Sequence, residues 1–150
     1  ADADQLADPW SYIGAPKGTP MFGLEYTEPS DVKTLSDGEI MNLAGVEITA
    51  TLAPGHTPGS AVVRLESGTD RALFVGDLVH TPLQLLEPEH EICVSEDQAV
   101  AARSRRRVLE QAAATNSLVV PAHLGGAGAA EVARSNGTFS ITRWAPFPAF

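Results

Sequence analysis

The chain has 150 residues, of which 43% are hydrophobic and 6% aromatic, a composition that suits one domain with a core of its own. Its formal net charge of −9 disfavours binding to a nucleic-acid backbone or to an anionic membrane. The single cysteine, Cys93, excludes an internal disulfide and a thiolate-rich zinc site. We expect Cys93 to be a small buried hydrophobe, with a Cys–His nucleophile as the alternative.

The sequence contains no signal-peptide pattern and no apolar run near the roughly 20 residues that a membrane-spanning helix needs. We therefore expect a cytoplasmic protein that acts on a small molecule and binds neither nucleic acid nor membrane. Because the chain begins with Ala1 rather than methionine, we expect a processed or trimmed product.

Residues 1–31 carry many prolines and glycines with little periodicity, and they predict an irregular arm with a short helix near Gln5 to Ala7. The order improves from residue 32 onward, so we assign residues 32–150 to one domain. Ser36-Asp37-Gly38 then predicts a turn between residues 32–35 and residues 39–43.

Three strands are expected in the middle of the chain. Residues 46–52 alternate between apolar and polar side chains, which predicts a half-buried strand. Residues 61–65 predict a second strand, and residues 72–75 a buried strand that closes at Gly76-Asp77. A turn at residues 67–70 joins the last two.

One helix is expected, over residues 96–114. Ser95 and Gln98 have the spacing of a capping box at its start, and Asn116 is a plausible stop. Its arginine run predicts a solvated face made by Arg103, Arg106 and Arg107.

The C-terminal part predicts further strands. Residues 118–120 form a short apolar strand that delivers Pro121-Ala122-His123, and a glycine-rich loop follows. Asn136-Gly137 predicts a hairpin between residues 131–135 and 138–144. The expected class is α/β (α+β), with a mainly mixed or antiparallel sheet, one main helix on one face and a C-terminal hairpin.

Three potential metal ligands each follow a strand: His56, Asp77 and His123. Without thiolates, imidazole and carboxylate are the ligands for zinc, and also for iron or manganese. Such an ion can lower the pKa of a bound water to about 7 and so supply hydroxide in neutral solution. Gly55 and Gly76 let the backbone turn sharply before two of these side chains.

The sequence around these residues resembles the metallo-β-lactamase superfamily of metal-dependent hydrolases. The matching pieces are Thr51-Leu52-Ala53-Pro54-Gly55-His56-Thr57-Pro58-Gly59-Ser60, Ala72-Leu73-Phe74-Val75-Gly76-Asp77 and Val119-Val120-Pro121-Ala122-His123. Their order and spacing agree with the family over about residues 32–144. The resemblance implies an αββα sandwich with an active site at one sheet edge, and this chain corresponds to its C-terminal half.

The resemblance also implies roles for the three residues. His56 would be a ligand of a first metal, Asp77 the bridge between two metals and His123 a ligand of the second, with all three serving catalysis. The stretch from Gly76 to Leu85 resembles the lactonase and phosphotriesterase-like branch, whereas residues 28–46 resemble the glyoxalase II-like branch. Ester, lactone, thioester and phosphotriester substrates therefore all stay open.

The residues that follow Asp77 are candidates for substrate binding. We expect Leu83, Leu85 and Leu86 to line an apolar pocket. We expect His80 to shape the rim of that pocket or to lie on the surface, with the replacement of a missing metal ligand as its alternative role.

One part of the family pattern is missing from this chain. The other ligands of the family come from a His-x-His-x-Asp-His motif in its N-terminal half. The four histidines here are His56, His80, His90 and His123, and no two are separated by one residue.

Three interpretations follow from the missing motif. The first is a hydrolase with a reduced site, acting alone or as a homo-oligomer that rebuilds the sheet. The second is a non-catalytic half-fold that acts as an assembly or binding module through an exposed sheet face. The third is a fragment of a longer enzyme whose complementing N-terminal half carries the missing ligands.

Overall fold

The computed structural model describes residues 9–12, 14–20 and 34–145. The short helix expected near Gln5 to Ala7 lies outside these residues. The chain divides into two compact units, Ala1–Ser36 and Asp37–Phe150. In the first unit, α2 (Pro9–Tyr12) is the described helix, and the indole nitrogen of Trp10 donates to the carbonyl of Thr19 at 2.7 Å.

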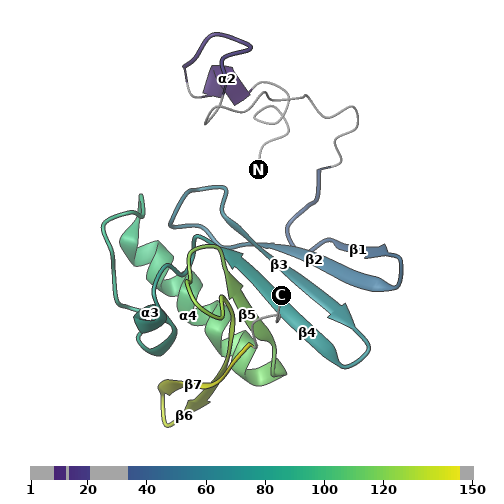
Figure 1. The fold of residues 1–150 in the computed structure, drawn as a ribbon, viewed down its shortest axis with the longest axis vertical. Coiled ribbons are helices and arrows are strands. Elements are labelled where there is room, and N and C mark those ends of the chain that lie inside the picture. The colour runs from purple at the N-terminus through teal and green to yellow at the C-terminus, as the bar shows by residue number, and fades with distance from the viewer. Residues whose placement is uncertain (1–8, 13, 21–33, 146–150) are drawn as a thin grey trace. The chain divides into compact units, whose positions relative to one another are not determined.

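The described residues of the second unit form one seven-stranded mixed sheet and two helices, in agreement with the expected class. The strands lie in chain order across the sheet, from β1 to β7 (Figure 1). The element bounds are β1 Ile40–Leu43, β2 Val46–Leu52, β3 Ala61–Ser67, β4 Asp70–Gly76, α3 Pro82–Leu86, α4 Gln98–Thr115, β5 Leu118–Pro121, β6 Ala130–Ser135 and β7 Thr138–Trp144.

The strand pairs explain the direction of each strand. Every neighbouring pair in the described sheet is antiparallel except β4 and β5, which are parallel. Parallel strands need a long crossover, and α3 and α4 supply it here. Because two reversals separate β2 from β4, the strands β2, β4 and β5 all point the same way.

The hydrophobic core lies between the sheet and α4. Leu73 and Val75 of β4 and Val119 of β5 are at most 2% exposed on this face. They form one cluster with Val108 and Leu109 of α4. Figure 1 shows α4 lying along β5, and α4 also contacts β6, so the helix covers this part of the sheet. Each fully buried side chain of this size contributes about 1.5–3 kcal/mol through removal of apolar surface from water.

The opposite face of the sheet is also apolar. Two rows of paired residues cross it from β2 to β5: Ala50, Val63, Phe74 and Val120 in one row, and Ile48, Leu65, Ala72 and Leu118 in the other. Several large side chains on this face are exposed, among them Leu43 (61%), Leu52 (45%) and Phe74 (43%). This face is named the open face below.

Helix α4 begins two residues later than its predicted start. The expected cap, Ser95, is wrong: the N-cap is Asp97, whose carboxylate accepts from the amide of Val100 at 2.9 Å. The amides of Glu96 and Asp97 donate instead to the carbonyls of His56 and Gly55, at 3.1 and 2.9 Å. These bonds tie the chain before α4 to the His56 loop, so the helix starts only after them. Asn116 ends the helix in the left-handed conformation, as expected.

In the part of the chain that the structure describes, the remaining predicted strands and turns form as expected, whereas α3 and the exposure of Cys93 differ from the predictions. Asn136 and Gly137 both have positive φ and form the tight turn of the β6–β7 hairpin. The helix α3 was not expected, and Cys93 is exposed rather than buried. Within the described residues, no helix combines the length and the hydropathy needed to cross a membrane.

Candidate metal centre

The three predicted metal ligands meet at one edge of the sheet. Asp77 follows the end of β4, His123 follows β5, and His56 lies in the loop after β2. Since these strands point the same way, their carboxyl ends lie at the same edge. The amide of Ala122 donates to the carbonyl of Gly76 at 3.1 Å, which extends the parallel pairing up to the site.

Asp77 lies between the two histidines and presents one carboxylate oxygen to each. His123 Nε2 is 2.8 Å from Asp77 Oδ1, and His56 Nε2 is 3.4 Å from Asp77 Oδ2. The side chains are unequally accessible: His123 is 55% exposed, Asp77 40% and His56 20%. The site therefore opens to solvent on the side of His123.

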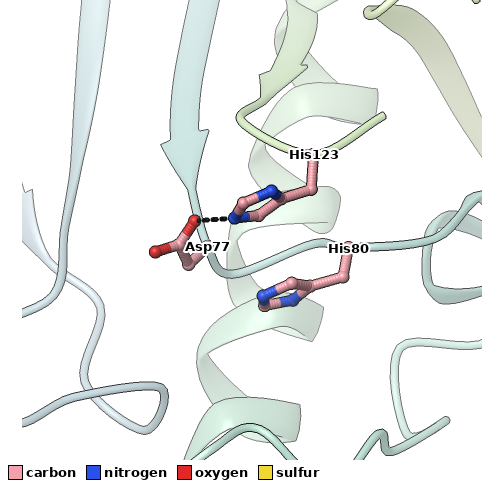
Figure 2. A group of neighbouring side chains, drawn as sticks. All are labelled: Asp77, His80 and His123. Atoms are coloured by element: carbon pink, nitrogen blue, oxygen red, sulfur yellow. Dashed lines mark ion pairs between the residues drawn. The ribbon is translucent and has the colours of Figure 1, made fainter. Parts of the chain in front are cut away.

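His80 joins this group from the segment that follows Asp77. Figure 2 shows its ring lying alongside the ring of His123, while the carboxylate of Asp77 faces His123. The two rings are stacked, with centroids 5.0 Å apart and planes inclined by 7°. Asp77, His80 and His123 each offer a ligand atom, and these atoms all lie within 4.8 Å of one another.

The electrostatics of the site favour a neutral His80. Burial lowers the pKa of this imidazole first, and the nearby His123 and His56 lower it further. Asp77 acts in the opposite direction. Because a metal binds the unprotonated nitrogen, these effects leave His80 in the form that a metal ligand requires.

The residues fit a divalent metal ion by their chemistry. Imidazole nitrogens and a carboxylate suit zinc, and catalytic zinc sites commonly have three protein ligands and one open position. The Nδ1 atom of His56 is buried and has no hydrogen-bond partner among the described residues. Native proteins rarely leave such an atom unsatisfied, and a bound ion or an ordered water is a usual explanation.

The three leucines predicted to bind substrate differ in their exposure to solvent. Leu85 is 0% exposed and belongs to the hydrophobic core, whereas Leu83 and Leu86 are 40% and 37% exposed. Leu86 lines a surface cavity of about 400 Å³ together with His90 and Phe139. Contact of the three leucines with a substrate stays a prediction.

Gln84 and Arg105 are two further residues, without a predicted role, that are buried beside the site. The burial of Arg105 could have been predicted from the helical period. This residue is four positions from Ala101 and from Leu109, which are both buried, so all three lie on the same face of the helix. An arginine in line with the buried face of a helix is either paired or functional.

The model of the metallo-beta-lactamase superfamily matches residues 4–123 of the chain. The chain belongs to the metallo-beta-lactamase superfamily. The match ends at His123, and it includes most of the N-terminal stretch that was assigned to an irregular arm. Membership in this superfamily agrees with the resemblance seen in the loop of His56 and in the strand ends at Asp77 and His123.

The relatives found by sequence match only part of this chain. Uncharacterized proteins of Mycobacterium tuberculosis and Mycobacterium bovis are both 33% identical to it over 81 residues, which are 51% of this chain and 36% of each relative. The chain thus spans about a third of the length of these relatives.

Several solved structures share the fold of this chain over part of their own length. The dizinc quorum-quenching lactonase AidC, solved in complex with a product, is 27% identical, with a TM-score of 0.61 over 71% of this chain and 36% of that one. The hydrolase AbOPH of the beta lactamase superfamily is 23% identical, with a TM-score of 0.60 over 67% of this chain and 35% of that one. A probable metal-dependent hydrolase from Staphylococcus aureus is 16% identical, with a TM-score of 0.60 over 75% of this chain and 39% of that one.

Proposed function

We propose that this chain carries part of the metal centre of a hydrolase that cleaves ester-type bonds, with lactones as the first substrate class to test. The observation that carries this proposal is the position of Asp77, whose two carboxylate oxygens face His123 and His56 at 2.8 and 3.4 Å. A carboxylate with an imidazole at each oxygen, at a solvent-accessible sheet edge, is a set of donors that suits a divalent cation.

We assign Asp77, His80 and His123 as the protein ligands of one divalent ion, with zinc as the preferred ion. Their ligand atoms already lie within 4.8 Å of one another, so small side-chain adjustments bring them to a common centre. His56 lies at the other oxygen of Asp77, where it stabilises the carboxylate or contributes to a second ion. When bound, a divalent ion supplies a nucleophile at neutral pH by lowering the pKa of coordinated water, and it polarises the bond to be cleaved.

The side chains contribute orientation and charge. The stacked ring of His123 limits the positions that His80 can adopt, and Asp77 holds His123 through a charge-assisted contact. The opening beside His123, the most exposed of the three, is the side from which a substrate would enter. The likeness to the lactonase AidC favours lactones over thioesters and phosphotriesters as the first substrates to test.

Turnover measurements test this function. Hydrolysis of an N-acyl-homoserine lactone, a thioester and a phosphotriester is followed with metal-free protein and with protein given one equivalent of zinc. We expect zinc-dependent turnover of the lactone that His123→Ala abolishes and that His90→Ala leaves unchanged. Turnover that is independent of metal, or that survives His123→Ala, would contradict the proposal.

A second function, that of an assembly module, is favoured by the open face. Leu43, Leu52 and Phe74 expose between 43% and 61% of their surface there. Contiguous apolar surface of this kind marks interaction sites in soluble proteins. We propose that another copy of the chain or a complementing N-terminal half covers this face, and that the metal centre acts in that assembly.

A further inference from the structure

Arg105 of α4 is a buried cation whose donors are directed at the segment that follows Asp77. Its side chain is 1% exposed. Nε donates to the carbonyl of Leu78 at 2.8 Å, and Nη1 donates to the carbonyls of Pro88 and His90, the latter at 3.1 Å. The carboxylate of Glu91 lies 3.4 Å from Nη1 and partly compensates the charge.

The chemistry of these contacts requires a guanidinium. Burial lowers the pKa of Arg105, and Glu91 opposes this effect. A buried charge is costly, and an apolar side chain of similar volume would fill the same space at lower cost. What arginine adds is a rigid fork of donors that reaches carbonyls on separate parts of a loop. Arg105 therefore fixes the backbone one residue beyond Asp77 and again at Pro88 and His90.

Gln84 connects the same network to His80. This side chain is 0% exposed. Its Oε1 atom accepts from the amide of His80 at 2.8 Å, and its Nε2 atom donates to the carbonyl of His90 at 3.1 Å. That carbonyl also accepts from Arg105. The backbone of His80 is thus linked to α4 through a short chain of buried hydrogen bonds.

The residue next to Arg105 holds the other loop of the site. Ser104 Oγ donates to the carbonyl of Pro54 at 2.7 Å, two residues before His56. Beside this contact Gly55 lies directly on α4, since a Cβ atom there would be 2.1 Å from the backbone nitrogen of Ala101. The His56 loop therefore has no space to move toward the helix.

We propose that α4 sets the spacing of the metal centre, with Arg105 positioning the segment of Asp77 and His80, and Ser104 positioning the loop of His56. Two neighbouring side chains on one helix hold the two loops, so a rigid element fixes the spacing between His56 and the segment of Asp77 and His80. The ligation part of this inference rests on the proposed function, whereas the positioning itself can be measured in metal-free protein.

Three variants of the full chain separate these roles. Arg105→Lys keeps the positive charge but removes the fork of donors. Ser104→Ala removes one hydroxyl in a helix interior, where alanine is the most favourable residue. Arg103→Lys is the matched control, because Arg103 is an exposed arginine on the same helix.

Two readouts are compared for each variant, at a temperature where unfolding measurements show that it is folded. The first is the affinity for Co²⁺, followed by its visible absorption. The second is the set of nuclear Overhauser effects (NOEs) in metal-free protein between the rings of His80 and His123, whose centroids are 5.0 Å apart, and between those of His80 and His56, at 5.3 Å.

We expect Arg105→Lys to weaken Co²⁺ binding about 10- to 100-fold, the usual effect of losing a group that orients a ligand, and to lose the NOEs between His80 and His123. Ser104→Ala should keep those NOEs and weaken the ones between His80 and His56. Arg103→Lys should match the wild type in both readouts.

Wild-type affinity and wild-type NOEs in both Arg105→Lys and Ser104→Ala would overturn the proposal, whatever their stability. If Arg105→Lys does not fold, Ser104→Ala decides: unchanged NOEs between His80 and His56 overturn the proposal, and weakened ones support it. If the wild-type chain binds no Co²⁺, the proposed metal function fails, and the NOEs still decide whether α4 positions the histidines.

Discussion

Asp77 and His123 face each other across the ends of the parallel strands β4 and β5, with His123 Nε2 2.8 Å from Asp77 Oδ1. This contact depends on a long-range feature, because β4 and β5 are adjacent only after the chain has passed through α3 and α4. The helix that completes the crossover also holds both neighbouring loops. The geometry of the site therefore depends on the packing of α4.

The role of His80 as a ligand is tested by His80→Asn, with His90→Asn as the control. Both changes remove an imidazole, but only His80 has a ligand atom within 4.8 Å of those of Asp77 and His123. We expect the Zn²⁺ dissociation constant to rise at least about 10-fold for His80→Asn and to stay unchanged for His90→Asn, as measured by calorimetry. Equal affinities in both variants would favour the ligand set His56, Asp77 and His123 instead.

The lowered pKa of His80 predicts how stability depends on pH in metal-free protein. Burial, followed by the charges of His123 and His56, moves its pKa below the ordinary value of 6.5. Between the folded pKa and about 6.5 the unfolded chain binds more protons, so the free energy of unfolding rises with pH in that range. This contribution is complete above about pH 6.5 and is lost as the pH falls through the folded pKa.

Nuclear magnetic resonance titration of the His80 ring gives its midpoint directly, and urea unfolding at several pH values gives the slope. His80→Gln should flatten the slope in this range. A midpoint at or above 6.5 in the folded wild type would contradict the assigned environment.

Substitution at two glycines separates backbone strain from close packing. Gly76 has a φ of 52° and open space where the methyl group of an alanine would lie. Gly76→Ala should therefore lower the free energy of unfolding by about 1–2 kcal/mol, for the left-handed backbone alone. Gly55 has a φ of 130° and lies against Ala101, so Gly55→Ala should lower the free energy of unfolding by about 1–3 kcal/mol more than Gly76→Ala, because of overpacking. Urea unfolding measures both, and equal losses of stability would show that the contact with α4 is loose.

The open face predicts self-association of the isolated chain. Phe74 is 43% exposed at the centre of an apolar row, so Phe74→Asp should shift the protein toward monomers in light scattering after size-exclusion chromatography. Leu83→Asp, at an exposed leucine of α3, is the control and should leave the association unchanged. A wild-type chain that is monomeric at high micromolar concentration would count against assembly through this face.

Local patterns were sufficient to predict the strands and the order of the site residues. The alternation in residues 46–52 and the Asn136-Gly137 turn depend on neighbouring residues, and both elements form as expected. Gly55 was expected to permit a sharp turn, and its φ of 130° agrees with that expectation. His56, Asp77 and His123 were placed at one sheet edge because each follows a strand, and the structure brings them there.

Features that depend on distant contacts were not predictable in the same way. The start of α4 is set by bonds from Glu96 and Asp97 to the His56 loop, which no local capping pattern contains. The stacking of His80 on His123 needs the parallel pairing of β4 with β5. The exposure of Cys93 likewise follows from its place in the loop before α4, rather than from the general tendency of cysteine to be buried.

The most direct test of the metal centre is the metal content per chain, measured by elemental analysis on protein purified without added metal and on its His123→Ala variant. We predict about one divalent ion per wild-type chain, because Asp77, His80 and His123 supply the usual three protein ligands of an open catalytic site, and its loss in the variant. A wild-type chain without bound metal, or a His123→Ala variant that keeps it, would contradict the account.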